Sequence, residues 1–462
     1  MKIYNTMTRE KEEFVPINEG EANIYVCGPT VYNFFHLGNA RPLVVFDCLR
    51  RYLEYIGYKV NFVQNFTDVD DKIINKAREE GITANEVSIN YIKEYFQDAK
   101  ALNVREASLH PKVTENMSDI IAFIEKLITK GFAYEVDGDV YYKTRAFSEY
   151  GKLSHQNIDE LEAGARINIE EKKHDPLDFA LWKARKEPDE IAWESPWGWG
   201  RPGWHIECSA MAQKFLGDTI DIHAGGRDLC FPHHENEIAQ SEACTGRPFA
   251  RYWMHNGYIT MNKEKVSKSK GNFFTVRELL EEFDGETLRF FLLQGHYRNP
   301  IEFSKELIYQ AKAGLDRIRR AKENLQYIIE NGHEGEVSED CINQLNKRID
   351  SFKMHMEDDL NTADAITDIF EMVTDINSQL EKNGKEYARL ALSKLQEVSN
   401  ILGFLQGEGT EEIPENVKIL AGERQEARKN KDFERADEIR DEVLKLGYEI
   451  KDTPEGMQIV KA

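Results

Sequence analysis

Two polar segments of the sequence have the residue types that bind a polyphosphate. The first contains His36, Gly38 and Asn39 in the order His-Leu-Gly-Asn, between an expected strand and an expected helix. Glycine lets the backbone approach a ligand, a helix N-terminus offers free N–H groups, and His36 and Asn39 add side-chain donors. A His-x-Gly sequence near a turn is common, so this segment alone also fits an ordinary turn.

The second segment, residues 265–272, reads Lys-Val-Ser-Lys-Ser-Lys-Gly-Asn. Lys265 and Lys268, separated by small residues and followed by glycine, predict a cationic loop that can cover a polyphosphate. It is not a P-loop, because the glycine-rich lead of that motif is absent. A merely solvated loop is the alternative, but two phosphate-seeking segments in one nucleotide fold are much less expected by chance.

Several cysteine, histidine and glutamate residues have donors suited to Zn²⁺. Cys27 and Cys208 supply thiols, and residues 231–237 read Phe-Pro-His-His-Glu-Asn-Glu. Pro232 suits a helix start, and His233 and Glu237 then stand on one helix face. Cys230 and His234 lie nearby, so the residues alone leave the ligand set open. Buried thiols and a capping histidine are the alternative interpretation of each.

Apolar periodicity predicts the elements that must position these residues. Residues 23–27 indicate a buried strand, residues 43–56 a helix that Gly57 ends, and residues 58–66 a second strand. Such a βαβ unit belongs to a parallel sheet, and nucleotides bind at the carboxyl ends of its strands. Strand character returns at residues 219–223 and 253–260. We therefore expect an α/β fold built on a Rossmann-like parallel sheet.

The rest of the chain divides by pattern. We expect the two halves of the sheet domain in residues 1–110 and 201–303, separated by an inserted domain, residues 111–200, with a strand at 140–143. After them we expect a helical bundle in residues 304–402, a linker in residues 403–416, and a small α+β region in residues 417–462. Ser304 and Thr362 are the expected caps of two bundle helices. Tyr448–Lys461 is the expected terminal hairpin, after a helix that Gly447 ends.

Composition narrows the class of protein. A chain of 462 residues predicts two to four domains. No apolar run approaches the roughly 20 residues that cross a bilayer, and the first residues lack a secretory signal, so we expect no membrane and a cytoplasmic protein. Six scattered cysteines suit a reducing compartment. A net charge of −22 argues against broad nucleic-acid affinity, so a polynucleotide would have to meet local basic patches.

The two phosphate-seeking segments resemble the HIGH and KMSKS signatures of class I aminoacyl-tRNA synthetases. Asn39 stands for the last histidine and Val266 for the methionine, and an asparagine still donates to phosphate. The stretches VCGPTVYNFFHLGNAR, NFTDVDDKI, DPLDFALWK, GRPGWHIECSAM and DLCFPHHENEIAQSE are similar to cysteinyl-tRNA synthetases in particular, and the resemblance covers nearly the whole chain.

The resemblance implies a fold, a reaction and site residues. The enzyme would join L-cysteine to ATP as an adenylate and pass cysteine to the terminal ribose of tRNA(Cys), without an editing domain. One Zn²⁺, held by Cys27, Cys208, His233 and Glu237, would accept the substrate sulfur. His36, Gly38 and Asn39 would contact ATP, Lys265 and Lys268 would stabilise the pyrophosphate, and Mg²⁺ would accompany ATP. Thr67, Trp204 and Asp228 would line the substrate pocket.

The resemblance also assigns the C-terminal region to the anticodon. The expected tRNA contacts are Arg424, Arg428, Lys429, Lys431 and Arg435. A salt-bridged surface helix is an equally good reading of these residues alone. The expected oligomeric state is a monomer.

Two other functions remain open at this point. A cysteine ligase that hands cysteine to an amino sugar would share the adenylating domain but lack the C-terminal region. A non-catalytic zinc- and tRNA-binding regulator would not need Lys265 and Lys268. The residues do not decide whether the protein also forms cysteine persulfides.

Overall fold

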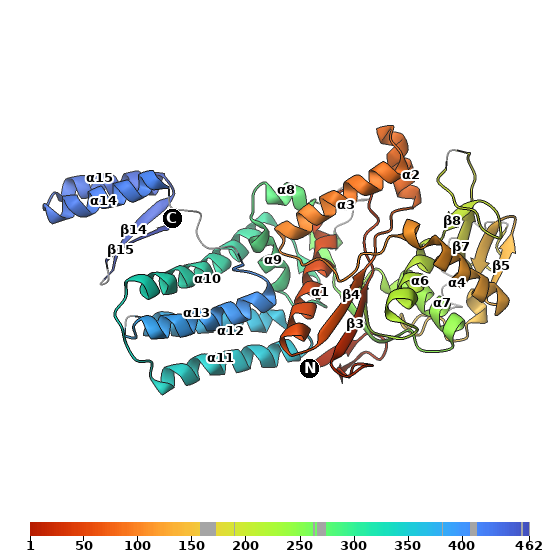
Figure 1. Cartoon of the computed structure of the whole chain (residues 1–462), viewed down its shortest axis with the longest axis horizontal. Helices are drawn as coiled ribbons and strands as arrows, with labels where there is room; N and C mark the ends of the chain where they lie inside the picture. The colour runs from red at the N-terminus through yellow and green to blue at the C-terminus, as the bar shows by residue number, and fades with distance from the viewer. Residues whose placement is uncertain are drawn as a thin grey trace. The chain divides into compact units, whose positions relative to one another are not determined.

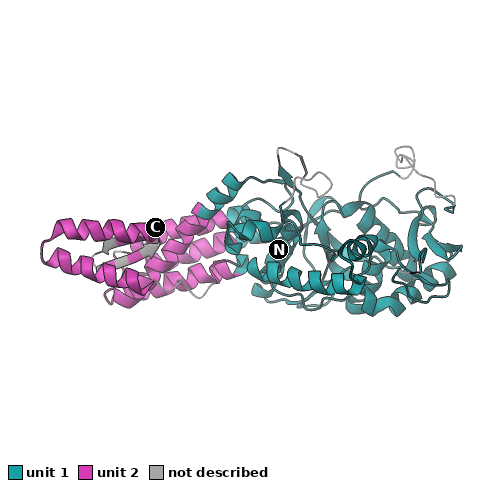
Figure 2. Ribbon diagram, turned by 90° about the horizontal axis from the view of Figure 1, so that it is seen from above, with its two compact units in different colours: residues 1–312, 353–365, 401–403 teal, residues 313–352, 366–400, 404–462 magenta. Residues whose placement is uncertain are grey.

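The computed structural model describes residues 1–157, 172–188, 190–261, 264–265, 274–380, 382–406, 414–453 and 456–461 (Figure 1). The chain separates into two compact units (Figure 2). The first contains residues 1–312, 353–365 and 401–403, and the second contains residues 313–352, 366–400 and 404–462. Within the described residues, no helix is both long and apolar enough to span a membrane.

A four-stranded sheet, entirely parallel and ordered β10-β9-β3-β4, forms the centre of the first unit. Its strands are β3 (Glu21–Val26), β4 (Lys59–Gln64), β9 (Ile220–Gly226) and β10 (Ala250–Asn256). Helix α1 (Leu37–Tyr55) connects β3 to β4, as Figure 1 shows, so the predicted βαβ unit is confirmed. The helix begins earlier than its apolar stripe indicated, because its first turn carries polar residues that line a cavity.

The segment between β4 and β9 adds an antiparallel sheet ordered β5-β6-β7-β8. Its strands are β5 (Ala133–Val136), β6 (Asp139–Tyr142), β7 (Phe179–Ala184) and β8 (Gly200–Pro202), preceded by α4 (Met117–Thr129). Ile120 and Trp182 of this segment belong to the same buried cluster as Tyr25, Val63 and Trp253 of the parallel sheet. The inserted segment therefore shares one hydrophobic core with the sheet that it interrupts.

Two helices beside this core carry site residues: α6 (Trp204–Leu216) and α7 (Glu235–Thr245). The prediction of a helix start at Pro232 is confirmed. Phe231 has an extended backbone (φ −141°, ψ 134°), and the helical turn that leads into α7 begins after this kink. His233 and Glu237 face each other as expected, with His233 Nε2 3.0 Å from Glu237 Oε1.

The remaining described elements of the first unit, before α10, are β1 (Lys2–Asn5), β2 (Glu10–Glu13), α2 (Asp71–Glu80), α3 (Ala84–Ala101), β11 (Ile259–Met261), β12 (Glu264–Lys265), α8 (Val276–Leu280), α9 (Gly285–Leu293), β13 (Ile301–Glu302), and the 3₁₀ turns Val113–Asn116 and Thr144–Ala146. A small sheet ordered β12-β11-β13 follows β10 in the chain.

Four long helices follow: α10 (Lys305–Asn331), α11 (Glu339–Glu357), α12 (Thr362–Gln379) and α13 (Lys385–Leu402). Ser304 caps α10 as predicted, because the Leu307 N–H donates to its Oγ at 3.3 Å. Thr362 does not cap α12. The Asp364 N–H donates to Asn361 Oδ1 at 3.3 Å, whereas Thr362 Oγ1 donates to the Leu293 carbonyl at 2.7 Å. Asn361 therefore caps α12, and the neighbouring threonine has the right residue type but a different hydrogen-bond partner.

The C-terminal residues form α14 (Glu415–Lys429), α15 (Phe433–Lys445), β14 (Tyr448–Thr453) and β15 (Gly456–Lys461). The two strands pair antiparallel, so the predicted hairpin is confirmed. Gly447, with φ +85°, lies between α15 and the hairpin. A small core joins Val417, Ala421, Ile439, Val443 and Ile450. Half of the expected linker, residues 407–413, lies outside the described residues.

Candidate active site and metal centre

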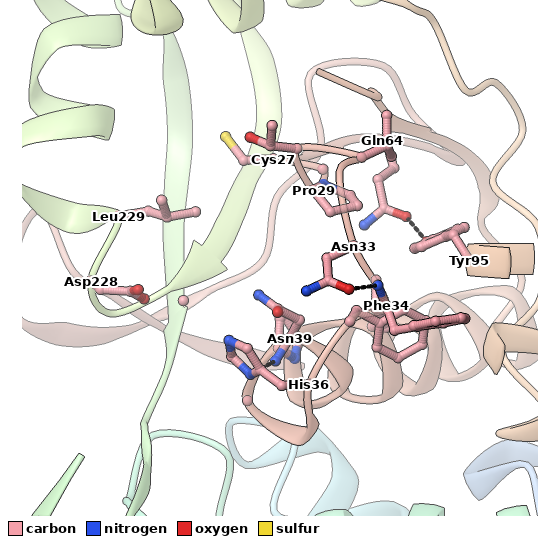
Figure 3. A pocket seen from close by; sticks show the side chains of 18 of the residues that line it. Cys27, Pro29, Asn33, Phe34, His36, Asn39, Gln64, Tyr95, Asp228 and Leu229 are labelled. Atoms are coloured by element: carbon pink, nitrogen blue, oxygen red, sulfur yellow. Dashed lines mark hydrogen bonds between the residues drawn. The ribbon is translucent and has the colours of Figure 1, made fainter. Parts of the chain in front are cut away.

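A cavity of about 350 Å³ opens at the carboxyl ends of the parallel strands. His36, Gly38 and Asn39 lie on one side of it, at the first turn of α1 (Figure 3). His36 is the N-cap of α1, and its Nδ1 accepts the Asn39 N–H at 3.3 Å. A Cβ at Gly38 would lie 2.8 Å from the His36 ring, so a side chain there would displace the ring from its capping position. The turn therefore offers backbone and side-chain donors to a bound anion.

The facing wall is formed by residues of β9, β10 and the loops that follow them. Asp228 and Leu229 lie across the cavity from His36 and Asn39 (Figure 3), and Tyr258 and Ile259 continue this wall. Because ligands of open α/β sheets bind between such walls, the space suits a nucleotide.

Two of the three predicted substrate residues, Asp228 and Trp204, line the cavity. Thr67 is not among its lining residues. Its side chain is buried and donates to Glu207 Oε2 at 2.9 Å, while its backbone N–H donates to Pro29 and its carbonyl accepts from Val31. Thr67 therefore holds the loop that borders the cavity and does not itself face the space.

Of the second phosphate-seeking segment, residues 265–272, the structure describes Lys265 alone. Lys265 pairs with Thr260 through β12 and β11, and Lys268 lies outside the described residues. After the gap, the Phe274 carbonyl accepts the Leu37 N–H at 3.1 Å, and the Val276 N–H donates to Phe35 at 3.0 Å. The chain that follows the lysine segment is thus hydrogen-bonded to the start of α1, beside the cavity.

Four side chains from separate elements converge at one edge of the cavity. Sγ of Cys27, after β3, lies 3.8 Å from Sγ of Cys208 on α6 and 3.3 Å from Glu237 Oε1 on α7. The donor atoms of Cys27, Cys208, His233 and Glu237 all lie within 4.8 Å of one another. The sequence-predicted metal residues therefore come together.

A second set of donors overlaps the first. Cys27 and Glu237 also lie within 4.8 Å of His223 and His234. His234 Nε2 is 3.4 Å from Cys27 Sγ, and His223 Nε2 is 2.8 Å from Glu237 Oε2. Cys230, the other nearby thiol in the sequence, belongs to neither group. Two thiols, three imidazoles and a carboxylate around one point suit Zn²⁺, which takes nitrogen, sulfur and oxygen ligands at short distances.

Burial makes the charges in this cluster interdependent. Burial raises the pKa of Cys27. The hydrogen bond that Cys208 accepts from Cys27 lowers the pKa of Cys208 to about 6. Burial opposes the charged form of His233, but Glu237 and Cys208 together outweigh it and raise the pKa of His233 to about 10. Burial likewise opposes ionisation of Glu237, but His223 and His233 outweigh it and hold its pKa well below the usual range. The cluster thus favours a thiolate at Cys208 and a carboxylate at Glu237, both beside the imidazole of His233.

A further layer of histidines contacts the cluster. His205 Nδ1 lies 2.9 Å from His233 Nδ1, which leaves His233 Nε2 toward Glu237. His255 Nε2 lies 2.8 Å from His234 Nδ1, and His255 Nδ1 lies 2.8 Å from Thr6 Oγ1. Such outer contacts fix the ring orientation of metal-binding histidines.

Sequence reasoning missed several residues of the site. His223 stands near the carboxyl end of a predicted parallel strand, which is the one signal that points to it. Gln64 also lines the cavity; the Tyr95 hydroxyl donates to its Oε1 at 2.6 Å, and the amide nitrogen points away from Tyr95 (Figure 3). No periodicity singles out Gln64, because its neighbours in β4 are buried as well.

The five expected tRNA contacts occupy two environments. Arg424 is buried, with 6% of its surface exposed, on the face of α14 that packs inward. The other four are exposed on α14, on α15 and between these helices: Arg428, Lys429, Lys431 and Arg435. Arg435 is paired with Glu438 at 3.0 Å, as the salt-bridged reading of this helix expects.

Comparison with known proteins agrees with these features. Residues 13–313 match the family model described as the tRNA synthetases class I (C) catalytic domain. Residues 351–406 match the DALR domain, and residues 410–459 match the cysteinyl-tRNA ligase anticodon binding domain. Methionyl-tRNA synthetase of Mycobacterium tuberculosis, solved with methionyl-adenylate, has the same fold, with a TM-score of 0.61 at 14% identity over 83% of this chain and 89% of that one. Agrobacterium radiobacter K84 LeuRS, solved with tRNA, also gives a TM-score of 0.61, at 11% identity over 85% of each chain.

The fold and the match to the catalytic-domain model together define this protein as a class I tRNA synthetase. Two curated relatives narrow this class. The cysteine–tRNA ligase of Caldicellulosiruptor saccharolyticus is 57% identical, and that of Clostridioides difficile strain 630 is 53% identical, each over 99% of both chains. The chain belongs to the cysteine–tRNA ligase family, which confirms the resemblance found in the sequence.

Proposed function

We propose that this protein activates L-cysteine with ATP, releasing pyrophosphate, and transfers cysteine from the adenylate to the 3′-terminal ribose of tRNA(Cys). The observation that carries the proposal is the buried cluster of Cys27, Cys208, His233 and Glu237 at the edge of a nucleotide-sized cavity. The thiol and imidazole ligands suit a metal ion that recognises a thiol. The turn at the start of α1, beside them, suits binding of phosphate.

Cys27, Cys208, His233 and Glu237 are the proposed ligands of one Zn²⁺. Bound there, zinc would supply a soft Lewis acid for the substrate thiol. Two features favour this set over the one with His223 and His234. It contains two thiols where the other contains one, and Nε2 of His223 already lies 2.8 Å from the second carboxylate oxygen of Glu237. His223 then acts as an outer partner that orients Glu237.

Dependence on one polar contact explains why cysteine is accepted and serine is not. A site built for such a contact rejects an analogue that cannot make it by about 10⁴ to 10⁵. The proposed enzyme therefore needs no editing step.

For activation, the protein's own residues position ATP and neutralise its charge. His36, Gly38 and Asn39 at the start of α1 bind phosphate, and Trp204 and Asp228 border the amino acid and the nucleoside. Lys265 and Lys268 are proposed to stabilise the departing pyrophosphate, with Mg²⁺ bound to ATP. Thr67 supports the loop at residues 29–31 from behind. Positioning and charge neutralisation supply most of the catalysis in such transfers.

The C-terminal region is the proposed reader of the anticodon. The match of residues 410–459 to an anticodon-binding domain supports this assignment and argues against the amino-sugar ligase. Arg428, Lys429, Lys431 and Arg435 are the proposed contacts, because their side chains are exposed, and buried Arg424 supports the helix from inside. We also propose the domain boundaries expected from the sequence and a monomeric state. The proposed location is the cytoplasm, because six free thiols suit a reducing compartment.

The decisive experiment measures cysteine-dependent exchange of labelled pyrophosphate into ATP, with and without a zinc chelator, followed by charging of tRNA(Cys). We expect exchange that the chelator abolishes, and charging of the tRNA. Exchange without charging would favour the amino-sugar ligase, and absence of exchange would favour the regulator. Substitution of Co²⁺ for zinc distinguishes the ligand sets, because the proposed set gives the charge-transfer intensity of two thiolates and the alternative gives that of one.

A further inference from the structure

Arg41 is a fully buried cation on the helix that begins at the phosphate-binding turn. None of its surface is exposed, and it is among the largest completely buried side chains of the described residues. It follows Asn39 closely in α1, but it does not line the cavity itself. Its guanidinium therefore lies behind the surface that the nucleotide would touch.

The hydrogen bonds of Arg41 go to two backbone carbonyls. Nη1 donates to the Tyr258 carbonyl at 3.0 Å, and Nη2 donates to the His296 carbonyl at 3.3 Å. Its Nε is buried and has no partner among the described residues. Burial lowers the pKa of Arg41 to about 9. A buried cation is expensive unless an anion lies nearby, and the described part of the chain pairs Arg41 with no carboxylate.

Other buried arginines of this unit are neutralised. Arg51, on the same helix, donates to Asp47 at 2.8 Å, and Arg289 donates to the same carboxylate at 2.6 Å. Among the residues that the structure describes, an acid thus accompanies two buried guanidinium groups, and none accompanies the one nearest the phosphate-binding turn. A negative ligand in the cavity would offset that charge, which acts over several ångströms in a medium of low polarity.

The contact with Tyr258 links Arg41 to both phosphate-seeking segments. Tyr258 lines the cavity and immediately precedes β11, whose partner strand β12 contains Lys265. One guanidinium therefore bridges the start of α1, which carries His36 and Asn39, and the base of the hairpin that leads into the lysine segment. Its planar fork can hold two carbonyls at once, which an ammonium group does less well.

We propose that Arg41 is a positioning residue for ATP, which fixes the phosphate-binding turn against the Tyr258 wall and provides a buried positive charge for the polyphosphate. This inference rests on the proposed use of ATP. Arg41 acts through its neighbours and does not touch the substrate.

The test compares Arg41→Gln and Arg41→Lys by pyrophosphate exchange. We expect Arg41→Gln, which removes the charge, to raise the KM for ATP by about tenfold or more, with the KM for cysteine and the zinc content unchanged. Arg41→Lys keeps the charge but holds the two carbonyls less well, so it should recover part of the ATP affinity. Thermal unfolding of each variant reports the stability separately.

Arg51→Lys is the matched control. It changes a buried arginine of the same helix that has an acidic partner away from the cavity lining, so it should lower the Tm and leave the KM for ATP unchanged. An unchanged KM for ATP in both Arg41 variants, or an equal rise in Arg51→Lys, would overturn the proposal. If the wild-type protein gave no exchange, the proposed function would fail, and calorimetric Kd values for ATP would then test Arg41 by themselves.

Discussion

Nε2 of His223 lies 2.8 Å from Oε2 of Glu237, and neither side chain is exposed. The other carboxylate oxygen, Oε1, faces Cys27 and His233. The His223 ring stacks on Trp253, with centroids 4.5 Å apart and planes 15° from parallel. Strand β9 thus presents an imidazole whose position is fixed by packing, and that imidazole selects which oxygen of Glu237 points into the cluster.

We therefore expect His223→Leu to weaken zinc binding by about 10- to 100-fold, the usual effect of losing an outer hydrogen bond to a metal ligand. Competition with a chromophoric chelator measures this affinity. His110→Leu is the control, since His110 is stacked on Phe66 outside the cluster and should leave zinc affinity unchanged. A loss as large as that in Cys208→Ser would instead make His223 a ligand.

Cys208→Ser should damage activation of cysteine far more than binding of ATP. A hydroxyl is a poorer zinc ligand than a thiolate, so the KM for cysteine in pyrophosphate exchange should rise by at least about 100-fold while the Kd for ATP stays within about twofold. Cys244→Ser is the control, because Cys244 is a buried thiol outside both donor sets. Equal losses for cysteine and ATP would indicate that Cys208 is structural.

Asp47 is a buried carboxylate whose ionisation should make the stability of the protein depend on pH. Burial alone would raise its pKa, but Arg289 and Arg51 outweigh burial and lower it. A lowered pKa in the folded state stabilises the protein above the unfolded value of about 4, and this contribution is lost as the pH falls from there through the folded value. Asp47→Asn should cost about 3–5 kcal/mol at pH 7, because it leaves two buried arginines without their acid.

Denaturant unfolding from pH 7 down to pH 3 measures this effect. The difference between wild type and Asp47→Asn should shrink below about pH 4. Asp358→Asn is the control, since Asp358 pairs with Lys11 at the surface and should cost at most about 1 kcal/mol. A difference that stayed constant with pH would show that the pair contributes through packing alone.

Gly28, which follows Cys27, is expected to tolerate no side chain. A Cβ there would lie 1.6 Å from the Asn65 carbonyl oxygen, so β3 and β4 would have to separate at the edge of the cavity. Gly28→Ala should therefore unfold the site, with loss of zinc and of exchange together. Far-UV circular dichroism and zinc content after purification report this outcome.

Gly422→Ala is the opposite case and serves as its control. Gly422 lies within α14, and a Cβ there would meet no atom within 4 Å. Alanine should stabilise this helix by about 0.5–1 kcal/mol, because glycine is a poor helix former. A Gly28→Ala protein as stable and active as Gly422→Ala would contradict the close approach of Gly28 to Asn65.

Local patterns predicted the elements of the fold well. The βαβ unit and the terminal hairpin follow from periodicity and turn residues, which act over short stretches of chain. The same patterns failed where a polar side chain has two possible partners, as with Asn361 and Thr362, and where burial depends on another element, as with Arg424. The first turn of α1 was missed because its residues serve a ligand and so break the apolar stripe.

The metal centre shows the same limit at longer range. The spacing of His233 and Glu237 on one helix face was readable, since it needs only local geometry. The approach of His223, His255 and Cys27 to that pair depends on the order of the strands in the sheet, which no local pattern encodes. Family resemblance selected Cys208 from the available thiols, whereas residue types alone left Cys230 equally eligible.

The distance along the chain between Cys27 and Glu237 has a consequence for how the protein is made. Cys27 leaves the ribosome long before Glu237, and the buried cluster that encloses it also needs the inserted segment. Until α6 and α7 have been synthesised, this thiol lacks its contacts with Cys208 and Glu237 and stays open to oxidation or to stray metal ions. Nascent chains stalled before α7 would therefore expose a thiol that the finished protein partly buries.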